Sequence, residues 1–141
     1  MANAVKWTTG TAIDPLTNEN FAAEAVLSLE IANHTNKDRF LALQLSTRFT
    51  DGAVPSAGDV VTCWVVPRVH SGATEANALL GTPVGTFPLV EDAHTDDQVC
   101  APIINIVIPP VACDVYIRND SVAATAGHTH LYAITYNEEI Q

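Results

Sequence analysis

Short stretches in which every second residue is apolar run through most of this 141-residue chain. In residues 25–31, for example, Leu27, Leu29 and Ile31 alternate with polar residues. Successive side chains of a β-strand point to opposite faces, so a period of two places the apolar residues on one face. Proline, glycine, asparagine and aspartate, which favour turns, separate the stretches. The pattern therefore predicts a series of short strands, each with one buried face.

Seven or eight such strands are expected, and they define the fold class. Leucine also favours helices, which leaves a helix as the alternative over 25–31 and 40–49. No regular alternation of strands and helices suggests a parallel sheet, so we expect an all-β, antiparallel β-sandwich that is jelly-roll-like. The expected strands are 25–31, 40–49, 59–66, 84–90, 99–108, 113–118 and 130–136.

The domain organisation follows from the length and from the first residues. A chain of 141 residues has the length of one domain. Residues 1–20 are rich in threonine, asparagine and glycine, and we expect an extended N-terminal arm that either frays or holds a neighbouring subunit. Residues 21–141 are then the single β-sandwich domain.

The segment around Trp64 is apolar on both faces, which predicts a central strand. Such a strand is covered on both sides by its own chain or on one side by a partner subunit. The residues that follow, 68–83, form the longest irregular segment, with one short helical turn expected at 74–80. Long irregular segments in compact domains are often interaction loops.

Charge and cysteine content exclude several classes of protein. Sixteen acidic residues face six basic ones, for a net charge of -10, so we expect no nucleic-acid binding and no membrane binding. Residues 1–10 lack the apolar core of a secretory signal, which predicts a protein made in the cytoplasm. Cys63 and Cys113 lie within strand patterns and are expected to be buried, with a disulfide or a metal site as the alternatives.

Candidate chemistry is sparse. His128 and His130 are two positions apart, which puts both on one face of a strand, and such a pair can hold a metal. A third ligand at a suitable offset is missing, so we expect no metal site and two partly solvated histidines near a strand end. No nucleophile elbow and no phosphate-binding loop occur. We therefore expect no catalytic residues, no cofactor and no enzymatic activity.

Two stretches near the C-terminus carry a resemblance. The runs from Val107 to Asp120 (VIPPVACDVYIRND) and from Thr129 to Tyr136 (THLYAITY) resemble the closing strands of small all-β virion structural proteins of tailed bacteriophages. The run from Gly58 to Pro67 (GDVVTCWVVP) resembles their middle strand. The resemblance implies a jelly-roll-like capsid decoration protein that clamps capsid subunits as a homo-oligomer, commonly a trimer.

The function expected on this basis is that of a non-enzymatic virion structural protein. Its partners are the major capsid protein or other virion proteins, and its location is the virion, assembled in the host cytoplasm. The alternatives are a cupin-like metal-binding enzyme and a glycan-binding or receptor-binding β-sandwich. The candidate interface residues are Trp7, Trp64, Arg68 and His70.

Overall fold

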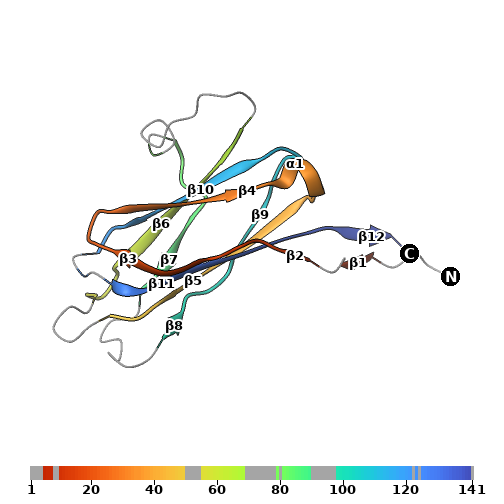
Figure 1. Ribbon diagram of the computed structural model, residues 1–141. Helices are drawn as coiled ribbons and strands as arrows, with labels where there is room; N and C mark the ends of the chain where they lie inside the picture. Colours follow the sequence, from red (N-terminus) through yellow and green to blue (C-terminus); the bar gives the residue numbers. More distant parts are fainter. Residues whose placement is uncertain are drawn as a thin grey trace.

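A computed structural model describes residues 5–7, 10–49, 55–68, 79, 81–89, 98–121, 123 and 125–140 (Figure 1). Strands dominate these residues, and one short helix, α1 (Asn33–Asn36), joins two of them. The strands are β1 (Val5–Trp7), β2 (Thr11–Ala12), β3 (Leu16–Phe21), β4 (Val26–Ile31), β5 (Phe40–Thr47), β6 (Val60–Pro67), β7 (Gly85–Pro88), β8 (Val99–Cys100), β9 (Ile104–Val107), β10 (Cys113–Asn119), β11 (Thr125–Tyr136) and β12 (Glu138–Ile140).

Two antiparallel sheets lie face to face, as the period-two pattern predicts (Figure 1). One sheet has four strands in the order β4-β10-β6-β7. The other has six, of which β2 and β3 both pair with β11, while β8 and β9 both pair with β5. Strands β2 and β3 follow one another along the same edge of β11, and β8 and β9 follow one another along the same edge of β5. The six-stranded sheet is therefore four strands wide.

The order of the strands is that of a jelly roll. With β2 and β3 counted as one interrupted strand, and β8 and β9 as another, the wider sheet has the order β2/β3–β11–β5–β8/β9. From β3 to β6 the chain changes sheets at each connection. Strands β6 and β7 are neighbours in one sheet. From β7 to β11 the chain again passes from one sheet to the other at each connection, with β8/β9 counted as one strand. Eight strands that alternate in this way between two sheets form a jelly roll, so the expected fold class is confirmed.

The core lies between the two sheets and is made by inward-facing residues of both. Three leucines of β5 and Leu131 of β11 face Val115 and Ile117 of β10 across it, and all are almost fully buried. Phenylalanines from three other parts of the chain fill the remaining space. The largest fully buried apolar side chains are Phe21, Phe49, Phe87, Ile31, Leu41, Leu43, Leu45, Ile117, Leu131, Val61 and Val115.

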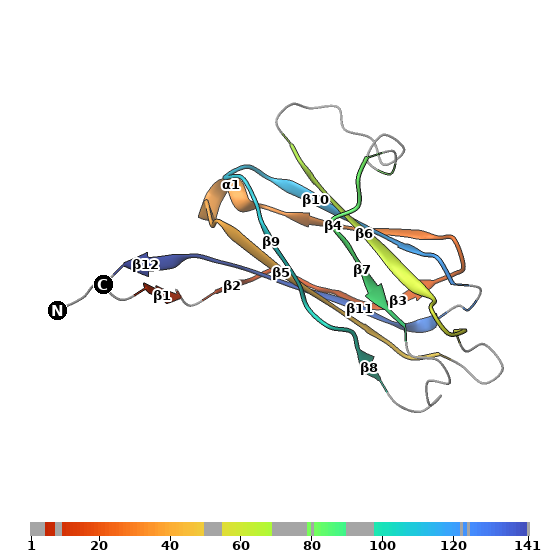
Figure 2. The same cartoon turned by 180° about the vertical axis from the view of Figure 1, so that it is seen from behind.

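The N-terminal segment is extended, but part of it belongs to the sandwich. Strands β2 and β3 lie along β11, so the sandwich begins before residue 21, the expected boundary. Beyond β2 and β11, the short strands β1 and β12 pair with each other and project from the two sheets (Figures 1 and 2). The first and last described residues, Val5 and Ile140, therefore lie at the same end of the molecule.

The strand around Trp64 is central, and the chain itself covers its outer face. Strand β6 pairs with β10 on one side and with β7 on the other. Leu79 packs against Trp64, and the Trp64 Nε1 donates a hydrogen bond of 3.1 Å to the carbonyl of Gly81. Of the two alternatives, cover by the chain itself is the one observed. The helical turn expected at 74–80 lies outside the described residues, apart from residue 79.

Candidate functional site

The outer face of the six-stranded sheet carries most of the exposed large apolar side chains. Among the described large apolar residues, the exposed ones are Val84 (37%), Ile103 (61%), Val107 (65%), Tyr132 (43%) and Ile134 (38%). All but Val84 lie on this sheet. The register of β11, β5 and β9 places them with their outward-facing neighbours on one surface, called here the apolar face: Phe40, Ala42, Gln44, Ile103, Asn105, Val107, His130, Tyr132, Ile134 and Tyr136.

The apolar face contains no Asp, Glu, Lys or Arg. Alternation explains this composition, since the even-numbered residues of β11 from 130 to 136 face outward while Leu131 and Ala133 face the core. Charged groups are found at both ends of the face. Arg48 contacts His128 at one end, and Arg39 pairs with Glu138 at the other, over 3.1 Å. The face is thus neutral in a chain with a net charge of -10.

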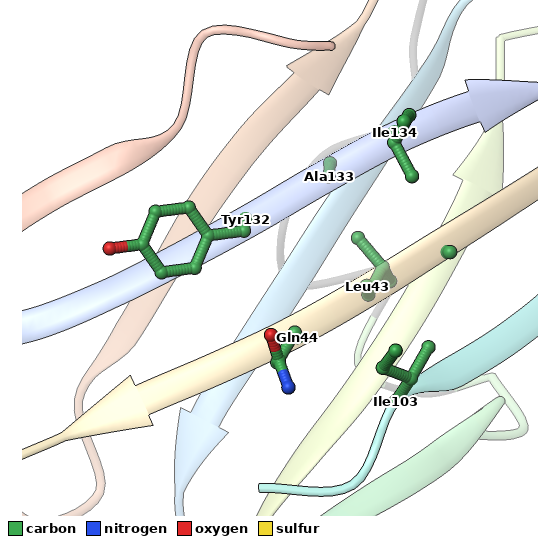
Figure 3. Close-up of a pocket in the computed structure, with 7 residues that line it drawn as sticks. Leu43, Gln44, Ile103, Tyr132, Ala133 and Ile134 are labelled. Carbon is green, nitrogen blue, oxygen red and sulfur yellow. The ribbon is translucent and has the colours of Figure 1, made fainter. Parts of the chain in front are cut away.

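A shallow hollow of about 150 Å³ lies in the middle of this face (Figure 3). Tyr132 and Ile134 of β11 stand along one side of it. Gln44 of β5 and Ile103, which precedes β9, stand along the other. An apolar space of this size accommodates a group as large as benzene or a branched aliphatic side chain. Its remaining lining residues are Ala42, Leu43 and Ala133.

Aromatic contacts order one end of the face. The rings of Phe40 and Tyr136 stack with their centroids 5.2 Å apart. The Tyr136 hydroxyl donates a hydrogen bond of 2.6 Å to Asn105 Oδ1, which ties β11 to β9 across β5. The Arg39 guanidinium lies 5.4 Å from the centroid of the Phe40 ring. These contacts hold the aromatic side chains in place without occupying the hollow.

His128 and His130 share one face of β11, as their spacing predicts, but that face is the outer one. A ring nitrogen of His128 accepts a hydrogen bond from the Arg48 guanidinium, and this positive charge opposes a metal cation beside it. The His130 ring stacks on Tyr132 at 6.0 Å, and its buried Nδ1 has no hydrogen-bond partner among the described residues. Within the residues that the structure describes, no three metal-ligating side chains come together.

Of the four interface residues expected from the sequence, the structure describes the side chains of Trp64 and Arg68. Trp64 is only 4% exposed, and the Arg118 guanidinium lies 5.0 Å from its ring centroid. Arg68 is exposed at the end of β6, where it forms ion pairs with Asp114 and Glu30. Trp7 lies on the projecting strand β1, and His70 lies outside the described residues. No described contact links Trp64 or Arg68 to the apolar face.

Apart from His130, which was considered as a metal ligand, the sequence analysis did not single out the residues of the apolar face. The signal was present in residues 130–136, where Tyr132, Ile134 and Tyr136 occupy one side while Leu131 and Ala133 occupy the other. Apolar residues on both sides of a strand indicate that both faces are covered. Here only the inner face is covered by the described part of the chain.

The sequence matches no protein-family model. A search of curated proteins finds no match either. Among solved structures the chain is similar to a family 35 carbohydrate-binding module from an environmental isolate, with 10% identity and a TM-score of 0.47 over 98% of this chain and 88% of that one. No helix in the described residues is long and apolar enough to cross a membrane.

Proposed function

We propose that this chain is a non-enzymatic assembly protein that docks on another protein surface through its apolar face. The observation that carries this proposal is the gathering of Ile103, Val107, Tyr132 and Ile134 on one neutral surface. Contiguous exposed apolar surface is costly to leave in water and commonly marks a protein contact. Aromatic and aliphatic residues without charge are also typical of the centre of protein interfaces.

The partner that we propose is the capsid of a tailed bacteriophage, which the chain decorates or stabilises as a symmetric homo-oligomer. Two features support this finer assignment. The runs 58–67, 107–120 and 129–136 resemble strands of small virion structural proteins. The jelly roll is also a fold of viral capsid proteins, and it occurs in lectins and cupins as well.

A glycan-binding function is the second candidate, and Tyr132 is the residue that favours it. Its ring is 43% exposed beside the hollow on an open sheet surface, and exposed aromatic rings are suited to stacking on sugars. The cupin-like alternative has less support, because His128 faces outward and contacts the Arg48 guanidinium. The capsid-binding and glycan-binding candidates both use the apolar face, and they differ in the ligand that it contacts.

Cosedimentation with capsids tests the proposal. The capsids are assembled from the major capsid protein of the genome that encodes this chain, and the wild-type chain is expected to pellet with them. Tyr132→Glu places a charge on the apolar face and is expected to leave the chain in the supernatant. Val84→Glu makes a similar change to an exposed apolar residue outside the face and serves as the matched control.

Three outcomes would contradict the capsid assignment. One is a genome that encodes no capsid protein, and another is a wild-type chain that stays in the supernatant. The third is equal pelleting of the wild type, Tyr132→Glu and Val84→Glu, because the apolar face would then not be the contact. Saturable binding of the wild type to an oligosaccharide array, lost in Tyr132→Ala, would favour the glycan-binding candidate instead.

A further inference from the structure

We infer that the free edge of β4 binds an extended, basic segment of another protein by pairing with it as a further strand of the sheet. This edge is separate from the apolar face, because β4 belongs to the four-stranded sheet and the apolar face to the six-stranded one. Binding at β4 is thus a second contact, beyond the proposed function. Three features of the edge point to such a partner: free backbone groups, an uninterrupted strand and an acidic groove.

The backbone of β4 leaves hydrogen-bonding groups free along one side. The carbonyl of Ala25 accepts a hydrogen bond of 3.1 Å from the N–H of Asn119, at the end of β10. Bonded and non-bonded pairs alternate along an antiparallel ladder, so the odd-numbered residues of β4 direct their N–H and C=O groups to β10. The even-numbered residues direct theirs to the opposite side, where no described strand pairs with β4. These residues are Val26, Ser28 and Glu30.

The other edges of the two sheets contain proline, whereas the edge of β4 does not. Pro88 ends β7, at the opposite edge of the same sheet. Pro15 separates β2 from β3, and Pro102 separates β8 from β9, at the two edges of the six-stranded sheet. Proline has no N–H to donate, and its presence protects a free edge from pairing with other chains. Strand β4 runs for six residues without proline or lysine, so this described edge is open to a further strand.

A groove of about 450 Å³ lies beside the edge of β4. Leu29, Glu30 and Ala32 form one side of it, and residues 11–14 of the N-terminal segment form the other. When a strand is added to the edge of a sheet, main-chain hydrogen bonds hold it while alternate side chains enter neighbouring pockets. The groove therefore provides space for a side chain of the added strand.

The charges beside the edge specify the chemistry of the partner. The two segments that border it, residues 10–16 and 22–32, contain three acidic residues and no lysine or arginine. The three are Asp14, Glu24 and Glu30, and all are exposed. Asp14 and Glu30 also line the groove. A segment with basic side chains is complementary to this edge.

Neither Arg68 nor a second copy of this chain supplies the missing positive charge. Arg68 lies 3.3 Å from Glu30, but two shorter hydrogen bonds of 2.6 Å hold it on Asp114. A second copy carries a net charge of -10 and brings further carboxylates to the edge. Lysine or arginine at alternate positions of another protein fits better, because each has a long apolar stem for the groove and a charged end for the carboxylates.

Amide hydrogen exchange of the full chain, followed by NMR, tests the inference. The probe is a synthetic peptide of alternating lysine and valine. Without the peptide, the N–H groups of Val26, Ser28 and Glu30 are expected to exchange faster than those of Leu27 and Leu29, which bond to β10. The peptide is expected to slow exchange at the three even-numbered positions and to shift the signals of the groove residues.

Two substitutions at Ser28 separate strand addition from other modes of binding. Ser28→Pro removes an N–H on the free side of β4, so the hydrogen bonds to β10 are retained. It is expected to weaken peptide binding by about tenfold or more. Ser28→Ala keeps the N–H and is the matched control. Glu30→Gln is expected to weaken binding about two- to fivefold, as for an exposed ion pair. The circular dichroism spectrum and the urea midpoint verify that each variant is folded.

Several outcomes would overturn the inference. One is slow exchange at the even-numbered positions in the absence of peptide, and another is no response to the peptide up to about 1 mM, the range of weak binding. Equal binding by Ser28→Pro and Ser28→Ala would exclude strand addition. Equal binding of a peptide of alternating glutamate and valine would exclude the preference for a basic partner. Protection that grows with protein concentration alone would assign the edge to a second copy instead. Cosedimentation with capsids depends on none of these results, so the two proposals are tested separately.

Discussion

The side-chain amide of Asn33 donates a hydrogen bond of 2.8 Å to the carbonyl of Pro109, 76 residues further along the chain. Asn33 lies in α1, between β4 and β5, and Pro109 lies between β9 and β10. Both connections pass from one sheet to the other, so this bond joins two crossings at one end of the sandwich. The same amide nitrogen donates to the carbonyl of Asp38, and Asn33 Oδ1 accepts from the Asp38 N–H.

Replacing this side chain is expected to destabilise the fold. Asn33 is fully buried, and Asn33→Ala leaves two carbonyl groups and one N–H without this partner. We expect the free energy of unfolding to fall by about 2–4 kcal/mol, since each unsatisfied buried group costs about 1–3 kcal/mol. Urea denaturation measures the change. Thr35→Ala, at an exposed position in the same helix, is the control; an equal effect of the two substitutions would contradict the role assigned to Asn33.

Arg68 holds Asp114 through two hydrogen bonds, from Nε and Nη2, each of 2.6 Å. Hydrogen bonding to Asp114, followed by the negative charge of that carboxylate, raises the pKa of Arg68. Asp114 is buried on β10, and we expect Arg68→Ala to lower the urea midpoint because this carboxylate loses its counterion. Arg68→Lys keeps the charge but not the two-point geometry, so it is expected to restore only part of the loss.

The urea midpoints of these two Arg68 variants show whether the charge of Arg68 alone, or also its two-point hydrogen bonding to Asp114, stabilises the fold. If Arg68→Lys is as stable as the wild type, charge alone explains the contribution. If Arg68→Ala is also as stable, the pair contributes nothing, as is common for ion pairs at exposed positions.

Asp120 links acid pH to stability. Burial acts to raise its pKa, but hydrogen bonds from Arg118 and Thr62 and the charge of Arg118 outweigh this effect and lower the pKa from its ordinary value of 3.8. A carboxyl whose pKa is lower in the folded state stabilises the fold above its unfolded pKa, and this contribution is lost as the pH falls through the folded value. Asp120→Asn is therefore expected to lose less stability than the wild type as the pH falls through and below the ordinary value of 3.8.

Urea denaturation at a series of pH values measures this difference. Asp14→Asn, at an exposed position on the N-terminal segment, is the control for removal of one carboxyl group. A wild type and an Asp120→Asn variant with parallel pH profiles would show that Asp120 is not a source of the acid sensitivity.

The three cysteines are expected to differ in reactivity. Burial raises the pKa of the Cys63 thiol to about 12, and burial, with a smaller contribution from Asp114, raises that of Cys113. Cys100 is exposed. Because the thiolate is the reactive form, a thiol reagent at about pH 8, near the ordinary thiol pKa, is expected to label only Cys100 in the folded protein. Unfolding in denaturant is expected to make Cys63 and Cys113 accessible to the reagent. Cys100→Ser is expected to abolish labelling of the folded protein.

Local patterns predicted several features of this structure correctly. The alternation in 25–31, 40–49 and 113–118 predicted strands that the structure contains. It also predicted that Cys63 and Cys113 are buried, which is confirmed. Glycine was expected among the residues that separate the strands, and Gly58, just before β6, has a φ of 84°, which is accessible to glycine without strain. Each of these features depends on a few neighbouring residues, so a short stretch of sequence contains the information.

The candidate site was harder to predict, because it depends on residues far apart in the chain. The spacing of His128 and His130 placed both on one face, but only the fold brings Arg48 to His128. The β2 and β3 pairing with β11 was also missed. Residues 10–21 carry few apolar side chains, and their place in the sheet is set by backbone hydrogen bonds to a distant strand.

The sequence by itself determined that this chain forms short strands with one or two apolar faces, since side chains alternate along any extended backbone. Only the tertiary structure decided which of these faces are covered. The segments around Trp64 and Tyr132 are both apolar on two sides, yet Leu79 and Gly81 cover Trp64 while Tyr132 remains 43% exposed. The difference has a physical cause: cover comes from whichever distant segment the strand order brings into contact, and a strand's own residues do not specify that segment.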